Sequence, residues 1–504
     1  MTDWIIEILK YDESKPLLFT QLYFWIFLTV VFLGYNFIYK NNFLRNFYLL
    51  LVSLFFYYKS GGYFFSLLIF STIVDYTAGI LIYHANKPYK RKIWLTISII
   101  TNLLVLGYFK YTYFIVDLIN ELFHTNYKVL NVLALLSNKA FNTNFDINNI
   151  ILPVGISFYT FQTMSYTIDV YRNKIKPVKN IFDFAFYVTY FPQLVAGPIV
   201  RASQFIPQLF LKYQLSKEQF GHAIFLILNG LIKKMVVSDY ISINFVDRVF
   251  ENPLSFSGIE NLMAVYGYAI QIYCDFSGYT DIAIGVSMLF GFRLPINFNS
   301  PYKATNITDF WRRWHISLSS WLRDYLYIPL GGNRKGKIRT YVNVMITMLL
   351  GGLWHGANIK FIIWGGIHGF ALIVHKLIKN IGLRIPENKI GKIISIFITF
   401  NLVCLAWIFF RASDMQTAYN MLISIFTNLN INLLPQIFSF YYTIFLIMLF
   451  AYIIHWLPYK IKENFRGFFI KSPVIVKIII VVIAIFIIYQ TKTSAIQPFI
   501  YFKF

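Results

Sequence analysis

Residues 392–411 have the sequence KIISIFITFNLVCLAWIFFR, in which a long, mostly apolar and uncharged run separates Lys392 from Arg411. A helix that crosses the hydrocarbon core of a bilayer needs about 20 such residues, so this stretch predicts a membrane-spanning helix. Similar stretches recur along the chain, at 17–39, 44–58, 62–83, 93–116, 147–170, 182–200, 222–246, 260–291, 340–356, 358–378, 417–434, 437–456 and 474–489. Several are short or interrupted by glycine or proline. We therefore expect about 11 transmembrane helices, with the remaining stretches forming re-entrant or interfacial helices.

The composition of the chain supports the same class of protein. Of the 504 residues, 57% are hydrophobic and only 13% are charged, and the mean hydropathy is +0.57. These values exclude a soluble enzyme, a disordered chain and a secreted disulfide scaffold. Because the apolar runs are continuous rather than alternating, they also argue against a membrane β-barrel. We therefore expect an all-α, polytopic integral membrane protein.

Basic residues predict the orientation of the chain in the bilayer. Lys and Arg total 45 against 22 Asp and Glu, a formal charge of +23. Because no soluble basic module is present to bind nucleic acid, the excess is better assigned to cytoplasmic loops. The basic groups at 40–45, 87–92, 172–179 and 460–471 all lie inside if both termini are extracytoplasmic. This assignment places the loop 117–146 outside and leaves the topology of 200–340 open.

No polar linker and no repeat divides the chain, so one integral membrane domain, 1–504, is predicted. Its parts are N-terminal helices (17–200), a candidate catalytic core (201–378), C-terminal helices (379–489) and an extracytoplasmic aromatic tail (490–504). Polar and aromatic residues gather in the core. Because ionisable groups at membrane depth usually face a cavity or a partner, we expect a central tunnel built around 270–360.

The densest group of polar and aromatic residues is 309–332, DFWRRWHISLSSWLRDYLYIPLGG. If 309–328 is one helix, four of its side chains share a face, namely Trp311, His315, Leu318 and Leu322. An interfacial amphipathic helix with aromatic anchors explains the same pattern. The alternative is a tunnel wall whose arginines meet lipid phosphates or an anionic substrate. The supporting tunnel residues expected here are Trp311, Arg312, Arg313, Trp314, Arg323 and Asp324.

A second group, 351–358, has the sequence GGLWHGAN and places His355 between small residues within an apolar run. Small neighbours would let a ligand approach the imidazole closely. A histidine here is either a structural core residue or a functional one, because ionisable groups are costly in a membrane and imidazole suits acid–base chemistry near neutral pH. Both interpretations stay open. Trp354 and Asn358 are added as supporting residues.

Two carboxylates, Asp275 and Asp281, lie in the apolar segment 271–285. Their spacing of six does not place them on one helical face, and the Ser-Gly at 277–278 predicts a break in the helix. They either cap and pair with arginines or line the tunnel. Metal binding is not predicted, because no paired-cysteine or His-Glu-x-x-His spacing occurs, and no phosphate-binding loop supports ATP hydrolysis.

Taken in this order, the three groups resemble the membrane-bound O-acyltransferase family, and most closely its bacterial polysaccharide branch, typified by alginate and peptidoglycan O-acetyltransferases. The segment 194–205, LVAGPIVRASQF, and the closing 499–504, FIYFKF, share in the resemblance. The resemblance implies a multi-pass enzyme of the bacterial inner membrane with two histidines in a tunnel. By this resemblance His355 is the catalytic histidine. His315 is its partner, placed toward the cytoplasm, where it helps to bind or position the donor.

The resemblance also implies a reaction. An acyl group, expected to be acetyl from cytoplasmic acetyl-CoA, crosses through the tunnel to a hydroxyl of an extracytoplasmic polysaccharide, with no tightly bound cofactor. A positioned imidazole would remove the hydroxyl proton during attack on the thioester, for a gain of about 10²–10⁴-fold, and Asn358 is a candidate oxyanion stabiliser. Because the loop 117–146 is too small to form a catalytic domain, we expect a separate extracytoplasmic transferase, SGNH-hydrolase-like with a serine nucleophile, to complete the transfer.

The tail segment 497–504, QPFIYFKF, allows two interpretations. Its aromatic residues suit an interfacial anchor, or it folds back toward the tunnel mouth or docks on an external partner. Related acyl-transfer systems carry a similar C-terminal motif with a central tyrosine. By that resemblance Tyr501 is a candidate acyl relay, which would accept the group at His355 and pass it to the extracytoplasmic transferase.

Two rival functions stay open. One is an acyltransferase that uses a carrier-protein D-alanyl thioester or that acts on a lipid or protein acceptor. The other is a transporter without transferase chemistry, in which the polar residues at membrane depth form a permeation site. The identity of the donor tests the first rival, and the presence of a covalent acyl product tests the second.

Overall fold

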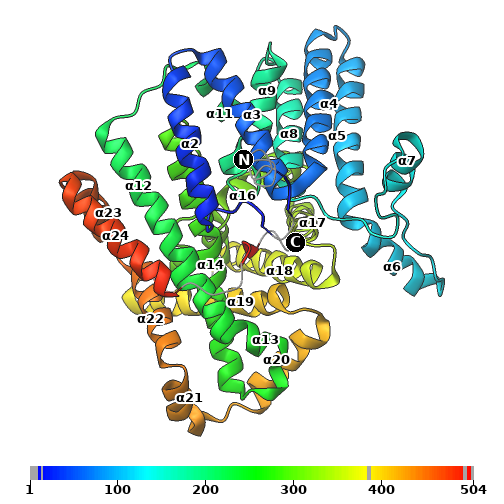
Figure 1. Cartoon of the computed structure of the whole chain (residues 1–504). Coiled ribbons are helices and arrows are strands. Elements are labelled where there is room, and N and C mark those ends of the chain that lie inside the picture. Colours follow the sequence, from blue (N-terminus) through cyan, green and yellow to red (C-terminus); the bar gives the residue numbers. More distant parts are fainter. Residues whose placement is uncertain (1–9, 13–14, 383–387, 492–496, 501–504) are drawn as a thin grey trace.

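The computed structural model describes residues 10–12, 15–382, 388–491 and 497–500, and every regular element within these residues is a helix. The all-α class predicted from the apolar stretches is thus confirmed for the described chain. Helices from all parts of the sequence surround a centre (Figure 1), and the last described residues, 497–500, return to that centre.

Six helical segments are long and apolar enough to cross a bilayer, namely Asn42–His84, Pro88–Phe123, Lys217–Glu251, Ile359–Asn380, Lys389–Arg411 and Val474–Thr491. Two bent pairs raise the number to eight among the described residues if each pair counts as one span: Met415–Thr427 with Ile431–Phe440, and Tyr442–Trp456 with Tyr459–Lys471. The expected count of about 11 is not confirmed. One reason is that the apolar stretch 182–200 forms only two short helices followed by irregular chain.

The N-terminal part of the chain consists largely of helices, several of which pack against one another. Their bounds are α2 (Leu22–Ile38), α3 (Asn42–Gly61), α4 (Phe65–His84), α5 (Pro88–Leu106), α6 (Thr112–Phe123), α7 (Val132–Phe141), α8 (Ile156–Tyr171), α9 (Ile181–Thr189), α10 (Phe191–Leu194) and α11 (Ala202–Phe205). Helices α4, α5 and α8 pack together. Between them the fully buried Asp75 accepts hydrogen bonds from Ser98 Oγ at 2.5 Å and from Asn102 Nδ2 at 2.9 Å. Because a buried carboxylate needs partners inside the protein, these two hydrogen bonds join α4 to α5.

The central helices carry the motifs. Their bounds are α12 (Lys217–Leu231), α13 (Asp247–Glu251), α14 (Gly258–Leu289), α15 (Ile307–Arg313), α16 (Ile316–Leu322), α17 (Lys337–His355) and α18 (Ile359–Asn380). The single helix considered over 309–328 is not formed, because α15 and α16 are separate helices that meet at Trp314 and His315. The predicted face of Trp311, His315, Leu318 and Leu322 therefore does not exist as one helical stripe.

The predicted break at 277–278 is also wrong, since α14 continues through both residues. The glycine there serves close packing instead. A Cβ added at Gly278 would lie 2.8 Å from the Gly230 carbonyl oxygen, and one added at Gly230 would lie 2.5 Å from the Gly278 carbonyl oxygen. Small residues at such a crossing let helix backbones approach closely. Helices α12 and α14 are thereby locked together at the centre of the molecule.

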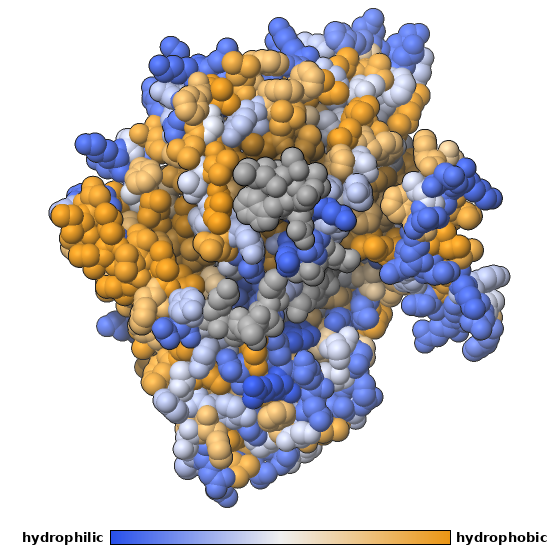
Figure 2. All heavy atoms as spheres, in the orientation of Figure 1, coloured by the Kyte–Doolittle hydropathy of each residue, from blue (hydrophilic) through white to orange (hydrophobic). Residues whose placement is uncertain are grey.

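The C-terminal helices wrap one side of this centre. Their bounds are α19 (Lys389–Arg411), α20 (Met415–Thr427), α21 (Leu434–Phe440), α22 (Tyr442–Trp456), α23 (Tyr459–Lys471) and α24 (Val474–Thr491). Large apolar side chains stay exposed along α24, and Ala484 is its one buried residue. Figure 2 shows hydrophobic side chains covering the flank formed by α23 and α24, and polar side chains gathered in the lower middle of the same face. An apolar flank of this kind suits contact with lipid.

We predict that Gly278→Ala destabilises the protein by about 1–3 kcal/mol, because the added methyl group forces α12 and α14 apart. The change should appear as a lower thermal unfolding temperature in detergent. Gly467→Ala is the matched control, because a Cβ at this glycine of α23 meets nothing within 4 Å, and alanine favours the helix. Equal unfolding temperatures for the two variants would contradict the close-packing role.

Candidate active site

Two buried histidines meet at the centre of the molecule. The ring centroids of His315 and His355 are 6.5 Å apart, with the rings inclined by 70°. Their exposed fractions are 0% and 3%. At this centroid separation the ring nitrogens lie beyond direct hydrogen-bonding distance of each other. The two imidazoles can therefore act on one group placed between them, but not as a directly bonded pair.

His315 is held by the interruption between α15 and α16. Its backbone is in the left-handed region, with φ 43°, which histidine adopts more readily than most residues. Its Nδ1 accepts a hydrogen bond from the Leu318 backbone N–H at 3.3 Å, so the side chain caps α16. Because Nδ1 is the acceptor, the neutral ring carries its proton on Nε2.

The interruption itself is fixed by Asn297. Its backbone carbonyl accepts from the Ile316 N–H at 3.0 Å. Its side-chain oxygen accepts from the Ser317 N–H at 3.1 Å and from Ser317 Oγ at 2.9 Å. The first amides of α16 are thus bonded to the preceding loop rather than to α15, and this is why one continuous helix does not form.

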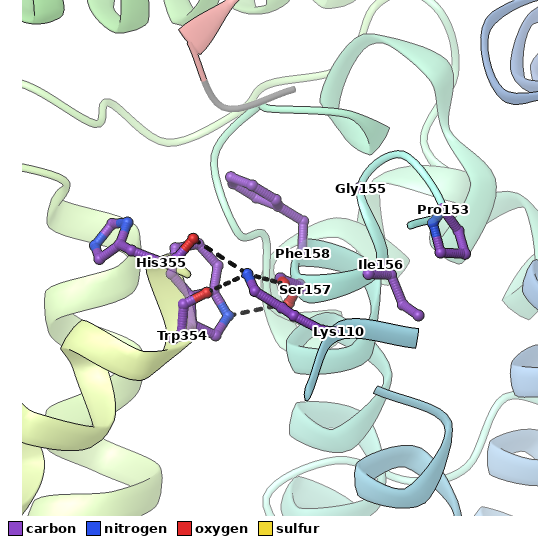
Figure 3. Close-up of a pocket in the computed structure, with 8 residues that line it drawn as sticks. All are labelled: Lys110, Pro153, Gly155, Ile156, Ser157, Phe158, Trp354 and His355. Carbon is purple, nitrogen blue, oxygen red and sulfur yellow. Dashed lines mark hydrogen bonds between the residues drawn. The ribbon is translucent and has the colours of Figure 1, made fainter. Parts of the chain in front are cut away.

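His355 is the last residue of α17, and Lys110 holds the end of that helix. The Lys110 ammonium donates to the carbonyl oxygens of Trp354 at 2.6 Å and His355 at 3.3 Å, and to Ser157 Oγ at 3.1 Å. Terminal helix carbonyls lack partners within the helix and carry partial negative charge, so a cation stabilises them. Figure 3 shows this contact, with the His355 imidazole pointing away from Lys110. The lysine therefore fixes the backbone of His355 and leaves its ring outside the contact.

Aromatic side chains enclose both imidazoles. The His355 ring centroid lies 5.0 Å from that of Trp354, 5.0 Å from that of Trp364 and 5.2 Å from that of Phe410. The His315 ring lies 4.7 Å from Phe276. A small cavity of about 20 Å³, enough for about one water, opens beside His355 and Lys110. The rings exclude bulk water from the pair and orient each imidazole.

The structure separates the two predicted carboxylates. Asp275 accepts from Lys234 Nζ at 2.6 Å and is almost fully buried. Asp281 accepts from Lys233 Nζ and from Asn229 Nδ2, both at 2.7 Å. Both thus take the pairing role that the sequence left open, but their partners are lysines and an asparagine rather than arginines.

The charged residues of 309–332 lie away from the histidines in mixed settings. Arg313 pairs with Asp309 at 2.9 Å, and Arg312 is exposed. Asp324 is bonded by Arg201 at 2.7 Å and by its neighbour Arg323 at 2.7 Å. This cluster joins the segment 194–205 to the end of α16, which the sequence did not predict.

The remaining predicted residues pack or cap. Trp311 lies against Trp364 and His368, at centroid distances of 5.7 and 5.1 Å. Trp314 is buried and stacks on Phe310 at 5.8 Å. Asn358 caps α18, because its side-chain oxygen accepts from the Lys360 N–H at 3.1 Å. That oxygen is therefore already engaged in holding the turn that follows His355.

The described part of the tail folds back into the protein. Phe499 is 1% exposed, and its ring lies 4.4 Å from that of Tyr279. An anchor lying at the surface does not fit these residues. Tyr501, the candidate relay, lies outside the described residues.

Two lysines that matter were missed from the sequence. Lys110 and Lys234 both lie within stretches predicted to be apolar spans, 93–116 and 222–246. A cation inside such a stretch is a signal in itself, because it needs a partner at membrane depth. What the sequence did not supply was the identity of the partners, which come from α17 and α14.

Comparison with known proteins supplies the family. Residues 105–449 match the model of the membrane-bound O-acyltransferase family. The chain is 38% identical to the peptidoglycan O-acetyltransferase of Helicobacter pylori over 80% of this chain and 78% of that protein. It is 39% identical to the probable alginate O-acetylase of Pseudomonas syringae pv. tomato over 80% of this chain and 73% of that protein. A teichoic acid D-alanyltransferase of Bacillus subtilis is 29% identical over 51% of this chain and 68% of that protein.

The matched region includes both histidines, Lys110 and the helices that hold them. It extends over more than half of the chain, and its relatives agree with it over most of their own length. The chain therefore belongs to the membrane-bound O-acyltransferase family and is a multi-pass membrane acyltransferase.

Proposed function

We propose that this protein O-acetylates an extracytoplasmic polysaccharide of a bacterial envelope, with acetyl-CoA as the cytoplasmic donor and His355 as the general base. The observation that carries the proposal is the enclosed pair of imidazoles, His315 and His355, whose rings are 6.5 Å apart. Relatives named as O-acetylating enzymes of peptidoglycan and alginate support the choice of acetyl group and polysaccharide.

The chemistry follows from what a neutral imidazole can do. His355 accepts the proton of an attacking hydroxyl, the new ester C–O bond forms at the thioester carbonyl, and the C–S bond breaks. The departing thiolate takes up a proton, so His355 returns to its neutral form. The apolar rings around the pair exclude competing water, which would otherwise hydrolyse the thioester.

His315 serves as the positioning partner in this proposal. Its Nδ1 is already occupied by the Leu318 N–H, which fixes the orientation of the ring. A ring that is fixed in place can orient the donor without taking part in proton removal. This division of labour fits the cytoplasmic side assigned to His315 by the family resemblance.

The hydroxyl that first receives the acyl group is proposed to be the phenol of Tyr501. The described residues just before it, 497–500, are folded into the molecule, where Lys234 and Asp275 bond the main chain at Pro498 and Ile500. The phenolic ester would then be attacked by the serine of an extracytoplasmic SGNH-hydrolase-like transferase, which regenerates the phenol and passes the acyl group to the polysaccharide. Both termini are proposed to be extracytoplasmic in the inner membrane.

The comparison with a teichoic acid D-alanyltransferase points to an alternative acyl donor. The Bacillus subtilis relative is named a teichoic acid D-alanyltransferase, which suggests a carrier-bound D-alanyl thioester as the alternative. The histidine pair serves either thioester equally well, so the donor must be tested directly.

We predict that His355→Ala lowers acyl transfer by about 10²–10⁴-fold, because the general base is removed. The measurement is transfer of radiolabel from acetyl-CoA by the protein reconstituted in liposomes. His84→Ala, which removes an exposed imidazole at the end of α4, is expected to keep wild-type transfer. Wild-type transfer by the His355 variant would contradict the assignment. Label from a D-alanyl carrier thioester but not from acetyl-CoA would replace the donor.

A second prediction separates chemistry from structure at His315. Asparagine accepts the left-handed backbone and caps helices well, so His315→Asn should unfold at a temperature closer to the wild type than His315→Ala does, yet transfer acyl groups about tenfold or more slowly, because donor positioning is lost. His315→Ala should lose about 0.5–2 kcal/mol of stability as well, since the cap is removed. Full activity of the asparagine variant would show that His315 only caps α16.

The relay makes a third prediction. Tyr501→Phe should abolish label retained on the chain and acylation of the polysaccharide, because only the accepting hydroxyl is removed. Tyr489→Phe changes an exposed tyrosine of α24, 73% accessible, and is the matched control. Undiminished polysaccharide acylation by Tyr501→Phe would rule out the relay while leaving the His355 assignment in place.

A further inference from the structure

The C-terminal segment 498–500 is held by two charged side chains through its main chain. Lys234 Nζ donates to the Pro498 carbonyl oxygen at 3.2 Å. Asp275 Oδ2 accepts from the Ile500 backbone N–H at 2.9 Å. The Pro498 carbonyl oxygen and the Ile500 N–H, two residues apart, are thus bonded by Lys234 and Asp275 respectively. Recognition of this kind reads main-chain groups rather than particular side chains.

The residue between the two bonds, Phe499, fills an aromatic pocket. Its ring lies 4.4 Å from Tyr279 and 6.4 Å from Phe19, and the Lys234 ammonium lies 4.7 Å from its centroid. Cations over aromatic faces are attractive, more so when removed from water. The pocket therefore adds one side-chain preference to the two main-chain bonds.

The receiving site is complete only with the tail in place. An ammonium group has three donors, and those of Lys234 reach Asp275 at 2.6 Å, Asp239 at 2.8 Å and the Pro498 carbonyl. The second oxygen of Asp275 is occupied by the Ile500 N–H. The side chains of Lys234 and Asp275 are 2% and 1% exposed. Without the segment, a buried donor and a buried acceptor would lose their partners, which is costly.

The segment also borders a polar cavity of about 190 Å³, which Gln497, Pro498 and Ile500 help to line. Within the described structure, two of its other lining groups, the Tyr268 hydroxyl and Gln271 Oε1, are buried without a hydrogen-bond partner. Polar atoms of this kind mark a site built to meet a polar ligand.

Some residues that line this cavity are sequence neighbours of residues that surround the histidine pair. Three of its charged lining residues each adjoin an aromatic residue of the enclosure. Asp275 precedes Phe276, whose ring packs on His315, and Arg411 follows Phe410, whose ring packs on His355. Lys360 precedes Phe361, which packs on Phe410. The lining of the cavity and the enclosure of the imidazoles are therefore built from adjacent residues of the same chain segments.

We propose that Lys234 and Asp275 form a peptide-backbone clamp, a binding site for a three-residue segment with an aromatic residue at its centre, occupied here by the chain's own residues 498–500. They are positioning residues, since they act through the tail and not on a reacting atom. The clamp rests on these contacts and not on the transfer chemistry proposed above. Its consequence is that residues 498–500 are held by main-chain groups and by the Phe499 ring, whatever the side chains at 498 and 500 are.

The test is hydrogen–deuterium exchange of the full chain in lipid nanodiscs, followed in the peptic fragment that contains 497–504. Ile500→Pro removes the N–H that Asp275 accepts, and Ile500→Val keeps it. We expect the proline variant to exchange its remaining tail amides at least about tenfold faster than the wild type, since a hydrogen bond to a charged group is lost, and the valine variant to match the wild type. Equal exchange by the two variants would overturn the clamp.

A second pair of variants tests the receiving side. Asp275→Leu removes both acceptor oxygens and should also release the tail. Asp281→Leu removes a carboxylate of the same helix whose hydrogen bonds within the described residues go to Lys233 and Asn229, so tail exchange in this variant should stay slow. Release by both or by neither would overturn the assignment to Asp275. Because exchange is measured without donor or acceptor, failure of the proposed acetyl transfer would leave these outcomes unchanged.

Discussion

A charged or hydrogen-bonding group buried among apolar helices has to find its partner inside the protein, and the centre of this molecule is organised by that requirement. Lys110 meets it at the carbonyls of Trp354 and His355. Lys234 meets it with Asp239, Asp275 and the returning tail. Except for Asp239, which lies five residues from Lys234, these partners come from distant parts of the sequence. These buried charges therefore fix the positions of neighbouring helices relative to one another more specifically than apolar packing does.

Features of the fold that depend on neighbouring residues could be predicted from the sequence, whereas features that depend on residues distant in the sequence could not. Apolar stretches such as 392–411 are local and continuous, and they predicted helix α19 (Lys389–Arg411) closely. The break at His315 was missed because it is made by Asn297, which contributes both its backbone carbonyl and its side-chain oxygen. The prediction of a break at Gly278 was wrong for a similar reason. This glycine allows close packing against a neighbouring helix and does not form a turn.

The candidate site shows the same division. Its two histidines could be named from the sequence, because short motifs around them resemble a family in which paired histidines are expected. The contacts that hold these two histidines in place could not be predicted. His315 caps a helix through Nδ1, and His355 lies at a helix end whose carbonyls are bonded by a lysine. Both arrangements depend on how the helices pack against one another. They explain why two imidazoles that are not bonded to each other keep a fixed relation.

The Lys110 contact has a consequence for modularity. The lysine belongs to the N-terminal part of the chain, the histidines to the centre, and Phe410, which packs on His355, to the C-terminal helices. The region 201–378 carries both histidines but does not hold them by itself, because His355 depends on contacts from both flanking parts of the chain. Removing either flank would take away one side of the enclosure of this imidazole.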